Sequence, residues 1–275
     1  MPKAKTADGF ALDYQRYGDG PPIVLVHELG GSQASFRLQV AAWSPLFSCV
    51  AYNARGYPPS DVPPARESYS QDIAASDVGA VLDAAGLADA HLLGVSMGAA
   101  SVLQFALRHP DRARSLVLAG IGSGSDEPPG AYKATMEAQA DFAESAGAKA
   151  LAEQMVEMPS RRRLKDKNPA EYRAFIDQLA QVSPLGIANT MRGIQARRPP
   201  LYAHKERLAA LKVATLIIVG DEDEPCIKPS RFLHGTIPGA RLEVIRACGH
   251  LANLEEPAIF NPMALGFIRD CENRR

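Results

Sequence analysis

The sequence predicts an α/β protein in which a mostly parallel central sheet is flanked by helices and carries an inserted helical cap. Short apolar runs recur along the chain, and each is followed by a turn and by a segment whose apolar residues have helical spacing. Such an alternation is typical of right-handed crossovers between parallel strands. The alternation stops after Gly120 and returns near residue 212.

Seven runs are predicted to be strands. Short continuous apolar runs indicate strands that are buried on both faces of a sheet. The Gly-Asp-Gly-Pro-Pro segment at 18–22 is a turn between the first two of them. In chain order, the predicted strands are 10–17, 23–26, 49–52, 91–95, 115–119, 215–219 and 242–245.

Helices are predicted between these strands, wherever apolar residues recur three or four positions apart. In the segment 71–85, the side chains of Ile73, Val78 and Val81 come close to this spacing. The segment 99–108 follows the strand at 91–95, and the segment 252–269 closes the chain.

The segment 122–211 contains no strand-like run. It is about 90 residues long, which is too long for a connecting loop in a compact domain, and prolines punctuate its amphipathic stretches. We therefore expect a core domain formed by residues 1–121 and 212–275, with a helical cap at 122–211 inserted in it. The candidate cap helices are 131–145, 148–158, 170–181 and 187–197.

Composition and charge restrict the partners that fit the chain. Of the 275 residues, 46% are apolar, and 30 basic against 31 acidic residues leave a net charge of −1. This balance gives no reason to expect nucleic acid or an anionic membrane as a partner. No uncharged apolar run approaches the roughly 18 residues that span a bilayer, and the N-terminus lacks the apolar segment of a signal peptide. We expect a cytoplasmic protein that acts on a small molecule.

The cysteines are scattered, with no CxxC pair and no spacing typical of zinc ligands. They are expected to be free thiols in a reducing compartment, and no metal site is predicted. The four are Cys49, Cys226, Cys248 and Cys271.

The strongest functional signal is the sequence Gly-Val-Ser-Met-Gly at 94–98. It matches the motif G-x-S-x-G and lies between a predicted strand and a predicted helix, the context in which this motif presents a nucleophilic serine on a sharp turn. Gly94 and Gly98 allow the strand and the helix to approach closely. A purely structural glycine turn is the alternative, but Ser96 is the candidate nucleophile.

A serine hydroxyl needs a base within hydrogen-bond reach. Of the six histidines, only His250 lies in a glycine-bearing loop just past a predicted strand, where sheets of this type gather their functional groups. His91 and His109 lie at the ends of predicted elements and are expected to be structural. His250 is therefore the candidate base.

An acid is also needed, because it holds the imidazole in the correct tautomer and stabilises the imidazolium. Residues 220–225 read Gly-Asp-Glu-Asp-Glu-Pro and follow a predicted strand directly. Asp221 and Asp223 compete for the role, and an acidic surface turn is the structural alternative. The order serine, aspartate, histidine along the chain favours a triad.

These segments resemble the α/β-hydrolase superfamily over nearly the whole chain. The segment 215–223 is similar to a family segment whose second aspartate is the catalytic acid, and on this ground Asp223 is preferred to Asp221. The other stretches that carry the resemblance are 27–32, 55–60 (Arg-Gly-Tyr-Pro-Pro-Ser), 109–113 (His-Pro-Asp-Arg-Ala) and 249–257 (Gly-His-Leu-Ala-Asn-Leu-Glu-Glu-Pro).

The resemblance implies that the backbone N–H groups of Leu29 and Met97 form an oxyanion hole, which stabilises charge that develops only in the transition state. Glu28 departs from the family pattern, because members usually have glycine at this position. A carboxylate aimed into the hole would oppose the developing charge. Glu28 is therefore expected either to turn aside, held by hydrogen bonds or a basic neighbour, or to enter the site as a substrate contact.

The resemblance also implies a serine hydrolase of the carboxylic-ester type, which forms an acyl-enzyme on Ser96 without a cofactor or a metal. The expected substrate is a small-molecule ester, lactone or thioester. Relatives that act as dehalogenases or epoxide hydrolases use aspartate as nucleophile, so the serine argues against both. Two alternatives stay open: the same triad used for C–C bond or amide hydrolysis, and a hydrolase-derived ligand receptor without turnover.

A basic run, Arg-Arg-Arg-Leu-Lys-Asp-Lys, lies at 161–167 within the expected cap. Such runs are usually solvated faces of helices. Attraction of an acidic substrate is the alternative interpretation.

Overall fold

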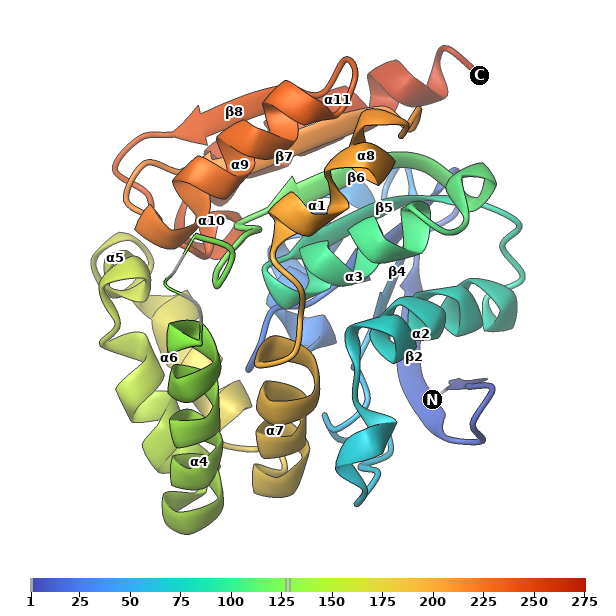
Figure 1. Ribbon diagram of the computed structural model, residues 1–275. Helices are drawn as coiled ribbons and strands as arrows, with labels where there is room; N and C mark the ends of the chain where they lie inside the picture. Colours follow the sequence, from blue (N-terminus) through green and yellow to red (C-terminus); the bar gives the residue numbers. More distant parts are fainter. Residues whose placement is uncertain (1, 127, 129) are drawn as a thin grey trace.

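The computed structural model describes residues 2–126, 128 and 130–275. Across this part of the chain, eight strands form one sheet: β1 (Lys3–Lys5), β2 (Ala11–Tyr17), β3 (Pro22–Val26), β4 (Ser48–Tyr52), β5 (Ala90–Val95), β6 (Ala113–Ala119), β7 (Thr215–Gly220) and β8 (Arg241–Ile245). Their spatial order is β1-β2-β4-β3-β5-β6-β7-β8 (Figure 1). The pairs β1–β2 and β2–β4 are antiparallel, and all the others are parallel. This architecture confirms the predicted fold class.

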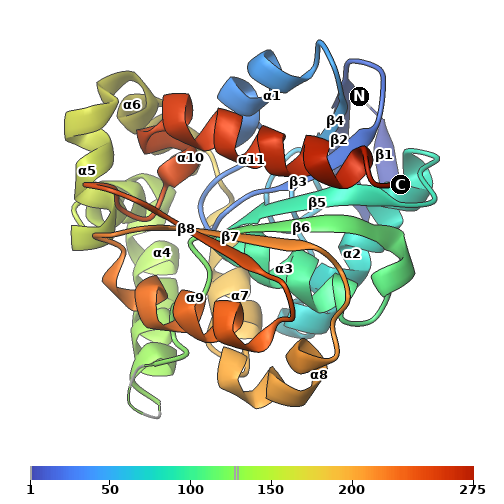
Figure 2. The same cartoon turned by 90° about the horizontal axis from the view of Figure 1, so that it is seen from above.

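The hydrophobic core lies on both faces of the sheet. Successive side chains of a strand point to opposite faces, so Ile23 and Leu25 of β3 join the core on one side and Val24 and Val26 join the core on the other. One side is covered by α1 (Arg37–Trp43) and α11 (Pro257–Glu272), and the other by α2 (Gln71–Ala84), α3 (Met97–Ala106), α8 (Lys205–Ala209) and α9 (Glu224–Thr236) (Figure 2).

Between β6 and β7, the described residues form helices and no strand. Most of these helices gather beyond one end of the sheet (Figure 1). Gly147, with φ 86°, interrupts the first of them, at the position where the sequence separates two predicted helices. The α-helices at this end are α4 (Ala131–Val156), α5 (Pro159–Lys167), α6 (Pro169–Leu179) and α7 (Pro184–Thr190), and the π-helical segment Met191–Gln195 continues α7. Helix α8 also lies between β6 and β7 in the sequence, but it packs on the face of the sheet.

Some elements escape prediction because they bury few apolar side chains. In β1 only Ala4 is buried, so the strand contains no apolar run. Helix α5 buries only Arg161 and Leu164, so its sequence has the character of a solvated basic segment. The predicted helix 252–269 differs in another way. It is two helices, α10 (Ala252–Glu255) and α11, because the backbone of Glu256 between them is not helical.

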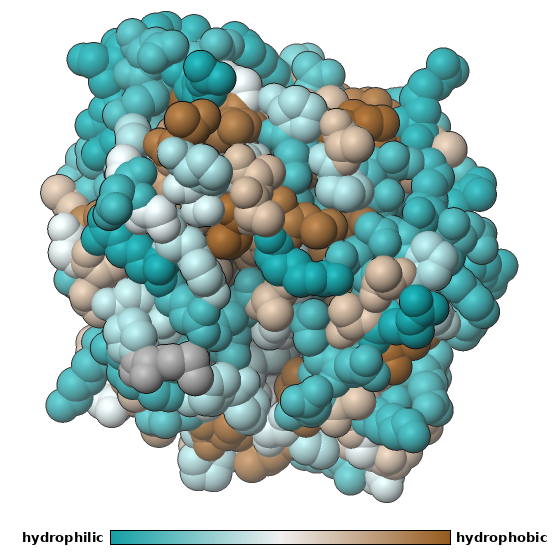
Figure 3. Space-filling view, turned by 180° about the vertical axis from the view of Figure 1, so that it is seen from behind, coloured by the Kyte–Doolittle hydropathy of each residue, from teal (hydrophilic) through white to brown (hydrophobic). Residues whose placement is uncertain are grey.

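On the face drawn in Figure 3, hydrophobic side chains form separate patches that hydrophilic side chains interrupt. In the part of the chain that the structure describes, no helix combines the length and the apolar character needed to cross a membrane. All four cysteines are buried free thiols, as predicted.

Candidate active site

Ser96 lies on a tight turn between β5 and α3. Its backbone has φ 54° and ψ −110°, a conformation that residues other than glycine rarely adopt. The glycines on either side permit the turn: a Cβ atom on Gly98 would lie 2.0 Å from the carbonyl oxygen of Val26, and one on Gly94 would lie 2.3 Å from the backbone of Gly98. The G-x-S-x-G motif therefore reflects close backbone packing, and this packing presents the serine side chain at the end of the sheet.

The three side chains that the sequence singled out come together. The hydroxyl of Ser96 lies 2.8 Å from Nε2 of His250, and Nδ1 of His250 lies 2.8 Å from Oδ2 of Asp223. Both His250 and Asp223 are buried. Because the carboxylate accepts from Nδ1–H, the lone pair of Nε2 faces the serine hydroxyl. The geometry suits transfer of the serine proton to the imidazole.

The two competing aspartates have different environments. Asp223 is fully buried beside the imidazole, whereas Asp221 is exposed and its Oδ1 accepts a hydrogen bond from the N–H of Cys248 at 3.2 Å. Asp221 therefore supports the backbone of the neighbouring loop, and Asp223 contacts the imidazole.

The histidine loop is held from two sides. The carboxylate of Glu255 accepts from the N–H groups of Gly249 and Leu251 at 2.6 and 3.1 Å, and the N–H of His250 donates to the carbonyl of Ser160 in α5 at 2.7 Å. Sequence reasoning missed both supports. Glu255 lies within the family-like stretch 249–257, but nothing in the sequence pairs Ser160 with this loop.

The backbone N–H groups of Leu29 and Met97 donate no hydrogen bond within the described residues. Met97 is the first residue of α3, so its N–H is one of those that a helix leaves without an internal partner. Leu29 and Ser96 line the same cavity. Both N–H groups are therefore free to donate a hydrogen bond to a negatively charged oxygen.

Glu28 is fully buried, and its Oε1 accepts a hydrogen bond from the hydroxyl of Ser35 at 2.9 Å. The carboxyl group packs against Gly31, where an added Cβ would lie 2.2 Å from Oε1. Glu28 is not among the residues that line the cavity beside Ser96. Burial raises the pKa of Glu28, which favours the neutral acid. Of the two placements that the sequence left open for Glu28, the structure has the one in which the carboxyl group turns away from the cavity.

His27 is buried next to Glu28, with Nδ1 2.7 Å from the carbonyl of Glu28 and Nε2 accepting from the N–H of Ala54 at 3.0 Å. Burial lowers its pKa to about 4. Between pH 4 and the ordinary histidine pKa of about 6.5, the unfolded chain binds a proton that the folded chain does not, so the folded state loses stability as the pH falls through this window.

We expect the substitution His27→Gln to flatten the dependence of the unfolding free energy on pH between about 6.5 and 4, by up to about 1.4 kcal/mol for each pH unit. Urea denaturation at several pH values in this window measures the slope. The matched substitution at exposed His109 is the control, and it should keep the slope of the unsubstituted protein. Equal slopes for all three proteins would contradict the assignment.

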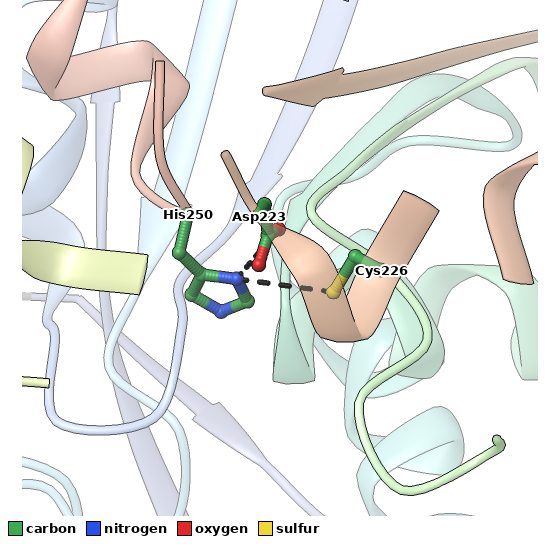
Figure 4. Close-up of side chains that lie close together, drawn as sticks. All are labelled: Asp223, Cys226 and His250. Carbon is green, nitrogen blue, oxygen red and sulfur yellow. Dashed lines mark hydrogen bonds and ion pairs between the residues drawn. The ribbon is translucent and has the colours of Figure 1, made fainter. Parts of the chain in front are cut away.

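Cys226 lies beside the imidazole, with its sulfur 3.9 Å from Nδ1 of His250 (Figure 4). The same sulfur lies 3.3 Å from the carbonyl oxygen of Gly120. The ligand-type atoms of Asp223, Cys226 and His250 all lie within 4.8 Å of one another. Burial raises the pKa of the Cys226 thiol well above its usual value, and metals bind the thiolate. Because Nδ1 of His250 is already hydrogen-bonded to Asp223 and the thiol stays protonated, this cluster suits proton transfer better than metal binding.

A cavity of about 170 Å³ opens next to Ser96 and His250. Its walls come mostly from the helices between β6 and β7. The lining includes the apolar side chains of Met136, Met155 and Met158 and the polar side chains of Tyr132, Gln139 and Arg161. The cavity is large enough for a small molecule and places it against the serine.

The fold and this arrangement of side chains define a known class of protein. Residues 21–257 match the model of the alpha/beta hydrolase fold family. The chain therefore belongs to the α/β-hydrolase family, which confirms the resemblance seen in the sequence.

The relatives that the chain resembles include lactonases, esterases and other hydrolases. The chain is 28% identical over 258 residues to 3-oxoadipate enol-lactonase 1 of Acinetobacter baylyi, covering 92% of this chain and 91% of the relative. It is 26% identical to a carboxylesterase of Bacillus subtilis, covering 91% and 81%. Among solved structures, the enol-lactonase of Burkholderia xenovorans LB400 is similar with a TM-score of 0.85 and 25% identity, covering 98% of this chain and 100% of that one.

Proposed function

We propose that the chain is a serine hydrolase that cleaves a small-molecule carboxylic ester or lactone through an acyl-enzyme on Ser96. The observation that carries the proposal is the pair of 2.8 Å contacts that connect His250 to Ser96 and to Asp223. The relatives named as an enol-lactonase and a carboxylesterase support an ester or lactone bond as the one that is cleaved.

The first half of the reaction forms the acyl-enzyme. His250 takes the proton of Ser96 through Nε2 as the serine oxygen attacks the carbonyl carbon. Asp223 stabilises the imidazolium that results. The N–H groups of Leu29 and Met97 donate to the oxyanion, each contributing about 3 kcal/mol to transition-state stabilisation. The C–O bond then breaks, the departing alcohol oxygen takes the proton from His250, and the acyl group stays on Ser96.

The second half returns the free enzyme. His250 removes a proton from a water molecule as the water oxygen attacks the acyl carbonyl. The same N–H groups hold the second oxyanion. Ser96 leaves with the proton from His250, and the free acid is released. One water is consumed for each bond cleaved, and no step uses a metal or an organic cofactor.

We propose that residues 122–211 act as a cap on a core formed by residues 1–121 and 212–275. The described helices of this segment supply most of the walls of the cavity. In this arrangement the core supplies the reacting groups, and the cap selects the substrate.

We expect p-nitrophenyl esters of graded acyl length to acylate the protein. When hydrolysis of the acyl-enzyme is the slow step, rapid mixing should release about one p-nitrophenol per chain in a burst before steady turnover. Mass spectrometry of the acid-quenched reaction should find the acyl group on the peptide that contains Ser96. Heat-denatured protein is the control.

Two results would contradict this proposal. Ester turnover without an adduct on Ser96 would point to a different nucleophile. Tight ligand binding by a protein whose serine resists a fluorophosphonate probe would favour a ligand receptor without turnover.

A further inference from the structure

Arg161 projects from α5 into the cavity that also contains Ser96 and His250. The residue is only 7% exposed, although it belongs to a basic run in which the next residue, Arg162, is exposed and Arg163 is partly exposed. A guanidinium keeps its charge in proteins. The cavity wall therefore holds a buried cation close to the reacting groups.

This cation has no direct anionic partner. Within residues 2–126, 128 and 130–275, no carboxylate forms an ion pair with Arg161, and its Nε has no hydrogen-bond partner. Its recorded contacts are weak ones: Nη1 lies 3.7 Å from the sulfur of Met158, and the guanidinium lies 5.8 Å from the centre of the Phe175 ring. Burial without a partner lowers the pKa of Arg161.

Another buried arginine shows how this fold satisfies such a group for structural purposes. Arg55, 2% exposed, makes two hydrogen bonds of 2.7 Å to the carboxylate of Asp77 and two more, of 2.8 and 3.1 Å, to that of Asp8. Leaving a buried charge unpaired is costly. Arg161 bears this cost in the free protein, whereas Arg55 does not.

The nearest acids do not replace the missing partner. Glu28 and Asp223 act on Arg161 only at longer range. Asp223 is bonded to His250, and burial of Glu28 favours its neutral form. The donors of the guanidinium therefore remain available to a molecule that enters the cavity.

We propose that Arg161 binds a carboxylate of the substrate, so that the preferred substrate is an ester or lactone that also bears a free carboxylate. This inference rests on the proposed function, because it places the carboxylate in the cavity while the ester carbonyl reaches Ser96. The planar fork of the guanidinium matches the two oxygens of a carboxylate. Arg161 is a specificity-determining residue in this scheme, and the bond-making steps stay with Ser96 and His250.

The test compares pairs of methyl esters with the same shape and different charge. Monomethyl succinate, glutarate and adipate are matched by methyl 4-methylpentanoate, 5-methylhexanoate and 6-methylheptanoate, in which a neutral isopropyl group replaces the carboxylate. A pH-stat records the acid released. We expect kcat/KM of the unsubstituted protein to favour the carboxylate ester of at least one pair by tenfold or more.

The substitution Arg161→Met should lower that preference by about 10- to 100-fold, mainly through KM, because a hydrogen-bonded charge pair is lost. Arg161→Lys should retain part of it. Arg163→Met is the matched control, since Arg163 lies two positions along the same helix and pairs with Glu222 at the surface. Melting temperatures establish that each variant is folded.

Binding separates this inference from the proposed function. In Ser96→Ala protein, calorimetry with succinate, glutarate and adipate should show affinity that the added substitution Arg161→Met lowers at least tenfold. If this binding is found but the unsubstituted protein hydrolyses none of the esters, the proposed function is wrong and the carboxylate site is still supported. Turnover with no preference for the charged esters, or binding and preference unchanged by Arg161→Met, would overturn the carboxylate site.

Discussion

Replacing Ser96 with alanine is expected to lower kcat for a p-nitrophenyl ester by about 10⁴- to 10⁶-fold. The substitution removes the oxygen that forms the acyl-enzyme, while His250 and the oxyanion donors remain to assist direct attack by water. The residual rate should therefore exceed the rate in buffer. Steady-state release of p-nitrophenol, corrected for buffer hydrolysis, measures the loss.

Ser101→Ala is the matched control for this experiment. Ser101 is a buried serine of α3, the helix that follows Ser96, and its hydroxyl donates to the carbonyl of Met97 rather than to the imidazole. Its substitution should change kcat by less than about threefold, because its hydroxyl has no part in the proposed reaction. A Ser96→Ala protein within tenfold of the unsubstituted rate would eliminate the nucleophile assignment.

The substitution Asp223→Asn is expected to lower kcat by about 10⁴-fold, with little change in fold. An amide at this position can donate to Nδ1 of His250, which favours the tautomer whose proton is on Nε2. That tautomer cannot accept the proton of Ser96. The amide also carries no charge to stabilise the imidazolium. Rates measured across a range of pH, together with melting temperatures, separate this effect from loss of folding.

Asp221→Asn provides the comparison, because it makes the same chemical change in the same loop. Its exposed carboxylate bonds to the N–H of Cys248, and the amide oxygen can still accept that bond. We expect the rate to stay within a few-fold of the unsubstituted protein. If both variants lost the same fraction of kcat, or if Asp221→Asn lost more, the assignment of Asp223 as the acid would be wrong.

The parallel core could be predicted from the sequence because its strands are buried on both faces. Strands β3, β5 and β7 are therefore continuous apolar runs. The elements that escaped lack this property. β1 depends on backbone pairing with β2, and α5 meets the core through a single leucine and an arginine. Neither the pairing of β1 nor the packing of α5 can be predicted from the pattern of apolar residues.

Some residues of the candidate site could likewise be predicted from the sequence, and others could not. The packing of Gly94 and Gly98 leaves a sequence motif, so Ser96 could be found directly. Spacing alone did not separate Asp223 from Asp221, because only the burial of Asp223 beside the imidazole distinguishes them. Arg161 was hidden within a basic run, since the sequence does not say which of three consecutive arginines faces inward.

The contact between the carbonyl of Ser160 and the N–H of His250 has a consequence for protein engineering. The helix that presents Arg161 also holds the backbone of His250 in place, so grafting this helix from another hydrolase would shift the imidazole as well. A productive graft has to preserve the acceptor oxygen at position 160 and the absence of a side chain at Gly249, against which that oxygen rests. Libraries that vary only positions beyond the first turn of α5 avoid this constraint.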